Sequence, residues 1–178
     1  MDRSTITLIG PLGVGKSTLA QLLSQKLALP RCCYDDLKLA YLEDAGFKLS
    51  EAHRIRDADC IHAMCMYTNQ FGIDVLERVI NEHVGYVIDF GAGSYCFENP
   101  AEIARASKSF APISNAFLLL PSDNLRENIL PLPGVREKRY MNTYFIMHPM
   151  NETLSKTTVY TAEKTPEESA TEIIGLLS

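Results

Sequence analysis

The residues with the clearest chemistry form one short loop near the start of the chain. Residues 10–17 read Gly-Pro-Leu-Gly-Val-Gly-Lys-Ser and match the pattern G-x-x-x-x-G-K-[ST] in full. Glycines in such a loop let backbone amides turn inward around phosphate oxygens, the lysine reaches the β and γ phosphates, and the final hydroxyl can ligate Mg²⁺. The loop therefore predicts binding of ATP with Mg²⁺ through Gly10, Gly13, Val14, Gly15, Lys16, Ser17 and Thr18, with Thr18 close to the α phosphate.

Carboxylates follow two other strand-like segments. Asp89 ends the apolar run Tyr86-Val87-Ile88, a position from which a carboxylate can hold the metal together with Ser17; its alternative role is to cap the glycine-rich loop that follows. Asp35 and Asp36 end the second strand, where one of them can accept a hydroxyl proton as the catalytic base. Neighbours on one backbone face different directions, so we expect the other to cap the following helix.

Cations are available in two regions. Arg54, with Arg56 as its neighbour, lies in a helical segment from which a guanidinium can grip an anionic acceptor, although a solvated face is equally compatible with these residues. The interruption Pro131-Leu132-Pro133-Gly134 is a candidate lid, and one cation beside it, for which we take Arg136, is expected to neutralise the transferring phosphate. The cations flanking it are Arg126, Arg136, Lys138 and Arg139.

Metal-site spacing is missing from the histidines and cysteines. The four histidines form no H-x-x-x-H pattern, so ordinary surface or core histidines are expected. The five cysteines include no C-x-x-C, which favours free thiols over a disulfide framework. A redox pair of Cys60 with Cys65 is the alternative.

Apolar runs and helical periodicity alternate along the chain, which predicts an α/β fold with a parallel sheet covered on both faces. Strands are expected at 5–10, 31–34, 86–89, 116–120 and 158–160, and helices at 16–29, 37–45, 50–69, 73–80, from 100, 122–129, 135–147 and from 166. Ser50 is the expected cap of the first mid-chain helix, Asn99 that of the helix from 100, and Thr165 that of the helix from 166. In the last helix we expect Ile173, Ile174, Leu176 and Leu177 to pack inward. Because ligands bind at the carboxyl ends of parallel strands, the loop, the aspartates and Gly91-Ala92-Gly93 should share one site.

Composition limits the partners. The 178 residues suit a single domain spanning 1–178, and the net charge of −5 lacks the positive field that nucleic acid or an anionic membrane surface selects. No signal-peptide pattern and no run of 18 apolar residues is present. We therefore expect a cytoplasmic protein whose partner is a small molecule.

The order of these features resembles the shikimate kinase branch of the nucleoside-monophosphate-kinase-like P-loop proteins. The resemblance rests on the phosphate loop, Asp35-Asp36, Arg54, the segment Val87 to Gly93 and the closing Val159-Tyr160-Thr161 strand with its helix. It implies a five-stranded parallel sheet in the order 2-3-1-4-5, ATP at the loop, and an acceptor held by Asp35 or Asp36, Arg54 and Gly91-Ala92-Gly93.

Departures from the family pattern concern the acceptor. Ala92 interrupts what is a triple glycine in the family, the lid is short, and Ile146-Met147-His148-Pro149 stands where the family carries an acceptor-binding arginine. A histidine is a poor bidentate carboxylate clamp. The leading hypothesis is therefore ATP-dependent phosphoryl transfer to the hydroxyl of a small molecule, with shikimate itself disfavoured as the acceptor.

Two alternatives stay open. A nucleoside or nucleotide kinase would need an aromatic side chain to stack on the acceptor base, for which Tyr34, Tyr67, Phe71 and Tyr95 are candidates. A nucleotide-binding regulatory protein would keep the loop without catalysis. A GTP-binding switch is disfavoured because no N-K-x-D-like segment is present.

Overall fold

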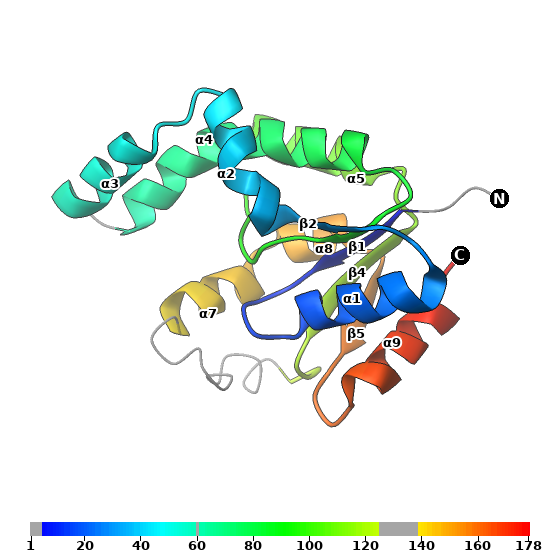
Figure 1. The fold of residues 1–178 in the computed structure, drawn as a ribbon. Helices are drawn as coiled ribbons and strands as arrows, with labels where there is room; N and C mark the ends of the chain where they lie inside the picture. Colours follow the sequence, from blue (N-terminus) through cyan, green and yellow to red (C-terminus); the bar gives the residue numbers. More distant parts are fainter. Residues whose placement is uncertain (1–4, 60, 125–138) are drawn as a thin grey trace.

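Five parallel strands form one sheet in the computed structural model, which describes residues 5–59, 61–124 and 139–178 (Figure 1). The strands are β1 (Ile6–Ile9), β2 (Arg31–Cys33), β3 (Val87–Asp89), β4 (Asn115–Leu120) and β5 (Thr157–Tyr160). Their order is β2-β3-β1-β4-β5, and every neighbouring pair is parallel. The predicted fold class and strand order are confirmed.

Helices cover both faces of this sheet. They are α1 (Lys16–Leu27), α2 (Tyr34–Asp44), α3 (Leu49–Ala58), α4 (Ile61–Glu82), α5 (Pro100–Phe110), α7 (Arg139–Met147), α8 (Met150–Leu154) and α9 (Pro166–Gly175). On one face Phe117 and Leu119 of β4 pack with α1 and α9, whereas Ala116 and Leu118 join the core formed with α4, α5 and α8. Strand alternation thus divides the interior into two buried layers.

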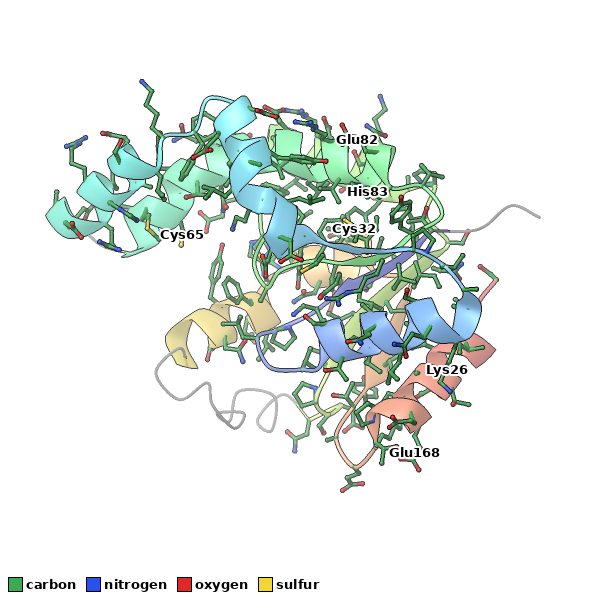
Figure 2. All side chains as sticks on the ribbon, in the orientation of Figure 1. Lys26, Cys32, Cys65, Glu82, His83 and Glu168 are labelled. Carbon is green, nitrogen blue, oxygen red and sulfur yellow. The ribbon has the colours of Figure 1, made fainter. Side chains whose placement is uncertain are left out.

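Two helix starts follow directly from local sequence. The Asn99 side chain accepts a hydrogen bond from the Ala101 amide at 2.9 Å, with Pro100 in the first helical position of α5. Thr165 and Glu168 form a reciprocal capping box at the start of α9; Figure 2 labels Glu168 there. Both predicted caps are confirmed.

The mid-chain helices divide at a different point from the one predicted. α3 ends at Ala58, and α4 then continues through Gly72 to Glu82 without the predicted break near residue 70. Ser50 is also not the cap, because Lys48 holds the N-cap position of α3 and makes no side-chain cap. Burial of Ile73, Leu76 and Val79 against the sheet outweighs the weak helical preference of one glycine.

Smaller differences occur toward the C-terminus. Helix α8 was not predicted, and Ser122 to Asn124 are not helical. Residues 125–138, which include the predicted lid 131–134, lie outside the described residues. Leu176 follows the end of α9 and is 45% exposed, so it does not pack inward as expected, whereas Ile173 is fully buried.

Among the described cysteines, Cys32, Cys33 and Cys96 are free thiols. Figure 2 shows Cys32 inside the molecule and Cys65 on α4. Cys60, the other half of the redox pair considered from sequence, lies outside the described residues. Among the helices that the structure describes, none is long and apolar enough to cross a membrane.

Candidate functional site

The phosphate loop, residues 10–17, joins the end of β1 to the first turn of α1. Gly13 and Gly15 have φ angles of 79° and 94°, which lie in the left-handed region that favours glycine. A Cβ on Gly10 would collide with the carbonyl oxygen of Leu119, so the loop also lies too close to β4 for any side chain at that position. α1 carries no acidic residue in its first turn. Its N-terminus can therefore receive an anion.

A buried polar chain holds the start of this loop in place. The Gly10 amide donates to the Tyr95 hydroxyl at 3.0 Å, and that hydroxyl donates to Asn151 Oδ1 at 3.0 Å. Asn151 Nδ2 in turn donates to the carbonyls of Phe145 and Ile146 at 2.7 and 3.0 Å. Tyr95 is fully buried, so it supports the loop and has no free face on which a base could stack.

Asn142 makes a second contact to the loop. Its Oδ1 accepts a hydrogen bond from the Leu12 amide at 2.8 Å, and Asn142 is 5% exposed. Sequence reasoning identified neither Asn142 nor Asn151, because both partners lie more than a hundred residues away from the loop in the chain. α7 and α8 thus support the phosphate loop through side-chain amides.

Lys16 is buried beneath the loop that it belongs to. Its Nζ donates to the carbonyls of Gly10 and Pro11 at 3.0 and 2.8 Å, and the residue is 8% exposed. Burial lowers the pKa of Lys16 from 10.5 to about 8, against the opposing charges of Asp89 and Asp35. The ammonium group is thus held inside the loop close to two carboxylates.

Asp89 and Ser17 meet directly. Ser17 donates a hydrogen bond to the Asp89 carboxylate, and Arg31 Nη2 lies 3.5 Å from Asp89 Oδ2. Asp89 is 4% exposed, and this burial raises its pKa despite the hydrogen bond and the charges of Lys16 and Arg31. The two residues predicted to hold the metal thus lie next to each other, and their binding of Mg²⁺ stays a prediction. Arg31 was not predicted, because its proximity depends on the pairing of β2 with β3.

The two aspartates after β2 have different surroundings. Both lie in the first turn of α2, which begins at Tyr34, and Cys33 occupies the N-cap position without a side-chain cap. The expectation that one of them caps the helix is therefore wrong, because the helix starts before either of them. The Asp35 carboxylate lies against Gly91, where a Cβ would collide with it. Both aspartates are exposed, but Asp35 lines a pocket with the phosphate loop, whereas Asp36 lines none of the described pockets.

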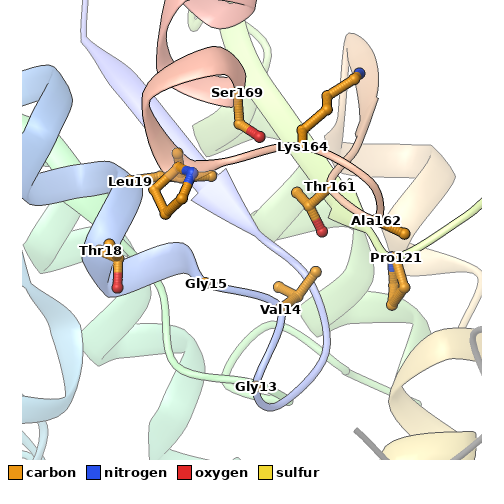
Figure 3. Close-up of a pocket in the computed structure, with 11 residues that line it drawn as sticks. Gly13, Val14, Gly15, Thr18, Leu19, Pro121, Thr161, Ala162, Lys164 and Ser169 are labelled. Atoms are coloured by element: carbon orange, nitrogen blue, oxygen red, sulfur yellow. The ribbon is translucent and has the colours of Figure 1, made fainter.

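Two pockets adjoin the phosphate loop. The first, here called the α2-side pocket, has a volume of about 370 Å³ and is lined by Leu12, Gly13, Gly15, Lys16, Ser17, Thr18, Asp35, Asp89, Gly91 and Ala92. The second, the α9-side pocket, measures about 270 Å³ and is lined by Gly13, Val14, Gly15, Thr18, Leu19, Pro121, Thr161, Ala162, Lys164, Pro166 and Ser169 (Figure 3). Both include Gly13, Gly15 and Thr18, so the loop forms their shared wall.

The α2-side pocket brings together most of the residues singled out from the sequence. Gly91 and Ala92 line it beside Asp35, while Gly93, with a φ of 79°, lies against the ring of Phe145 instead. The side chains of the α2-side pocket that carry oxygen atoms are all hydroxyls or carboxylates, and these are the hard donors that Mg²⁺ prefers. The donor set therefore fits the predicted metal. No cluster of three or more potential ligands among histidine, cysteine, aspartate and glutamate occurs in the described part of the chain.

Arg54 is not brought to this pocket. It lies on α3, is exposed, and makes two hydrogen bonds to Glu51, with Arg54 Nε 2.8 Å from Glu51 Oε2. Arg56 is likewise paired at the surface with Asp57. Arg136 lies outside the described residues.

The four aromatic side chains considered for base stacking differ in burial. Tyr34 is 1% exposed, and its ring packs at a tilt against that of Phe90, with ring centroids 5.4 Å apart. Tyr67 and Phe71 pack on each other and on Phe47. Tyr67 and Phe71 are half-buried, and none of the four candidates lines either pocket beside the phosphate loop.

His148 lies outside the α2-side pocket. It is buried just beyond the end of α7, and its Nδ1 accepts a hydrogen bond from the Met150 amide at 3.3 Å. Burial lowers the pKa of His148, partly offset by Glu98. A histidine held neutral in this way lacks the charge of a carboxylate-binding arginine.

The similarity of this chain to known proteins lies in its structure and not in its amino-acid sequence. No family model matches the chain, and no curated protein sequence matches it significantly. Solved structures match over nearly the whole chain. Shikimate kinase from Acinetobacter baumannii, in complex with shikimate, has a TM-score of 0.60 at 15% identity, covering 97% of this chain and 92% of that one.

Two further structures have the same architecture. Shikimate kinase from Aquifex aeolicus matches with a TM-score of 0.56 at 20% identity, covering 96% of this chain and 94% of its own. The YorR protein from Bacillus subtilis, in complex with phosphorylated GDP, matches with a TM-score of 0.55 at 15% identity, covering 97% and 95%. The chain thus has the fold of shikimate kinases and related small P-loop kinases.

Proposed function

We propose that the protein transfers the γ-phosphoryl group of ATP to a hydroxyl group of a small molecule. The observation that carries the proposal is the α2-side pocket, in which Lys16, Ser17 and Asp89 adjoin the carboxylate of Asp35. Phosphate-binding groups and a candidate base thus share one cavity. The fold shared with small P-loop kinases supports the same reaction class.

In this proposal ATP spans the two pockets across the shared loop wall. The triphosphate is held by the amides of the loop and by Lys16, which exchanges its hydrogen bonds with Gly10 and Pro11 for phosphate oxygens. The nucleoside lies in the α9-side pocket beside Thr18 and Leu19, and the acceptor lies in the α2-side pocket. Ser17 and Asp89 would hold Mg²⁺, which neutralises phosphate charge when bound.

Asp35 is the proposed base. Its carboxylate takes the proton of the acceptor hydroxyl while the hydroxyl oxygen forms a bond to the γ phosphorus. The bond between that phosphorus and the β–γ bridging oxygen breaks, and ADP carries the electron pair away. Lys16 counters the charge that develops on the phosphoryl oxygens. Gly91 leaves room for the Asp35 carboxylate, and Arg136, if it carries out the role predicted from sequence, would add a second cation.

The test is ADP release from Mg²⁺-ATP by the purified protein, with and without shikimate, polyols, sugars and nucleosides. Acceptor-stimulated release that is lost in Lys16→Ala would support the proposal. ATP binding without stimulation by any acceptor would favour the nucleotide-binding regulatory protein instead.

A nucleoside or nucleotide kinase is the second candidate. It is favoured by the shared fold with YorR, whose structure holds phosphorylated GDP. None of Tyr34, Tyr67, Phe71 and Tyr95 lines the α2-side pocket, which argues against stacking of an acceptor base there. The nucleosides in the acceptor panel distinguish the two.

A further inference from the structure

The hydroxyl of Ser169 is buried without a hydrogen-bond partner. Ser169 lies in α9 and is 1% exposed. Within the described residues, its Oγ and the Oγ1 of Thr7 are the two buried side-chain oxygens that lack any partner. Burying an unpaired hydroxyl lowers stability, so a ligand that offers this oxygen a hydrogen bond would recover part of that cost.

Other helical hydroxyls in the described chain satisfy themselves locally. Thr171, two residues further along the same helix, donates to the Glu167 carbonyl at 2.8 Å. Bonds of the same kind, to the carbonyl four residues earlier, are made by Thr68, Ser107 and Ser109. The corresponding carbonyl for Ser169 is that of Thr165, which accepts the Ser169 backbone amide at 3.0 Å. The Ser169 hydroxyl makes no such bond.

That hydroxyl instead faces the α9-side pocket. Ser169 is one of the residues lining it, and Figure 3 shows the Ser169 oxygen turned toward the open space between Leu19 and Thr161. The rest of the lining is suited to a flat, largely apolar group. Leu19, Pro121 and Pro166 contribute hydrocarbon surface, and the Lys164 ammonium is paired with Glu172 at 2.6 Å.

We infer that the Ser169 hydroxyl forms a hydrogen bond with the edge of the nucleobase of the bound nucleoside triphosphate. The inference rests on the proposed function, because the phosphate loop must hold the triphosphate for its base to enter this pocket. A hydroxyl can either donate to a ring nitrogen or accept from an exocyclic amine. The ligand thus supplies the partner that Ser169 lacks, and Ser169 contributes to recognition of the base rather than of the phosphates.

The test compares a ligand that has a base with one that does not. Affinities for Mg²⁺-ATP and for Mg²⁺-tripolyphosphate are measured by calorimetry on the wild type and on Ser169→Ala. We expect Ser169→Ala to weaken ATP binding roughly 3- to 10-fold and to leave tripolyphosphate binding unchanged. Without ligand, its melting temperature should stay the same or rise, because an unpaired hydroxyl has been removed.

Thr7→Val is the matched control, since it removes the other unpartnered hydroxyl, which lines neither pocket beside the loop. It should leave the affinities for both ligands unchanged. Equal affinities of wild type and Ser169→Ala for ATP, or an equal loss for both ligands, would overturn the inference while the proposed function stands. Failure of the wild type to bind either ligand would overturn the proposed function, and the inference with it.

Discussion

The two sides of the phosphate loop differ in how completely short-range sequence determines them. On the nucleotide side, the φ angles of Gly13 and Gly15 and the start of α1 all follow from eight consecutive residues. On the acceptor side, the candidate base Asp35 and its neighbour Gly91 come from distant parts of the chain and meet only through the sheet. Motifs therefore predict the proposed nucleotide site, while the choice between Asp35 and Asp36 at the proposed acceptor site requires the three-dimensional structure.

The largest expected effect separates Asp35 from Asp36. Asp35→Asn removes the proposed base, so kcat for the acceptor should fall about 10²- to 10⁴-fold. Asp36→Asn makes the same chemical change at an exposed position outside the pocket and should change kcat less than about twofold. Steady-state kinetics with an acceptor that stimulates turnover measures both. Equal losses in the two variants would remove the distinction on which the acceptor site is based.

A methyl group at Gly91 should have the next largest effect. The Cβ of Gly91→Ala would collide with the Asp35 carboxylate, which can move because it is the end of a side chain. We expect kcat to fall roughly 10²-fold through misplacement of the base, with the melting temperature nearly unchanged.

Gly72→Ala is the matched control, because its Cβ would make an ordinary contact with Phe97 at 3.6 Å. It should leave kcat unchanged and raise stability slightly through improved helix propensity. Full activity in Gly91→Ala would show that Asp35 need not stay where it lies.

Tyr95→Phe tests the support of the nucleotide side. Losing the hydroxyl leaves the Gly10 amide and Asn151 Oδ1 without their partner, which should lower the free energy of unfolding by about 1–3 kcal/mol. Tyr160→Phe, at a side chain that is 39% exposed, should change it by less than about 0.5 kcal/mol. Chemical denaturation compares them, and equal stability of the two variants would argue against the buried chain.

The smallest predicted effect concerns pH. The Lys16 pKa of about 8 in the free protein means that the ammonium loses its proton above that pH. Because triphosphate binding favours the charged form, ATP affinity should fall by up to about tenfold per pH unit above pH 8. Lys16→Arg keeps its charge throughout this range, so any affinity it retains should be independent of pH there. A wild-type affinity that stays constant from pH 7 to 9.5 would contradict the buried position of Lys16.

Short sequence patterns correctly predicted the strands and two of the helix starts. The five strands and the caps at Asn99 and Thr165 were predicted because apolar runs and capping patterns act within a few residues. The strand order was implied by the resemblance to shikimate kinases and not by these local patterns. The division between α3 and α4 was misplaced, because tertiary packing overrides the low helical preference of Gly72.

Long-range contacts explain what was missed in the site. Arg31 reaches Asp89 only because β2 pairs with β3, and Asn142 reaches Leu12 across most of the chain. The family resemblance implied that Arg54 holds the acceptor, and a solvated face was the alternative. In the structure its side chain pairs with Glu51 at the surface. Helix order alone does not determine which face a side chain occupies.

The most direct test of the account follows the phosphoryl group itself. The protein is incubated with γ-³²P-labelled Mg²⁺-ATP and an acceptor identified by stimulated ADP release, and the products are separated. We predict that the label is recovered on the acceptor hydroxyl with wild type and Asp36→Asn, and not with Asp35→Asn or Lys16→Ala. Label that stays on ATP or appears only as inorganic phosphate with the wild type would contradict phosphoryl transfer at this site.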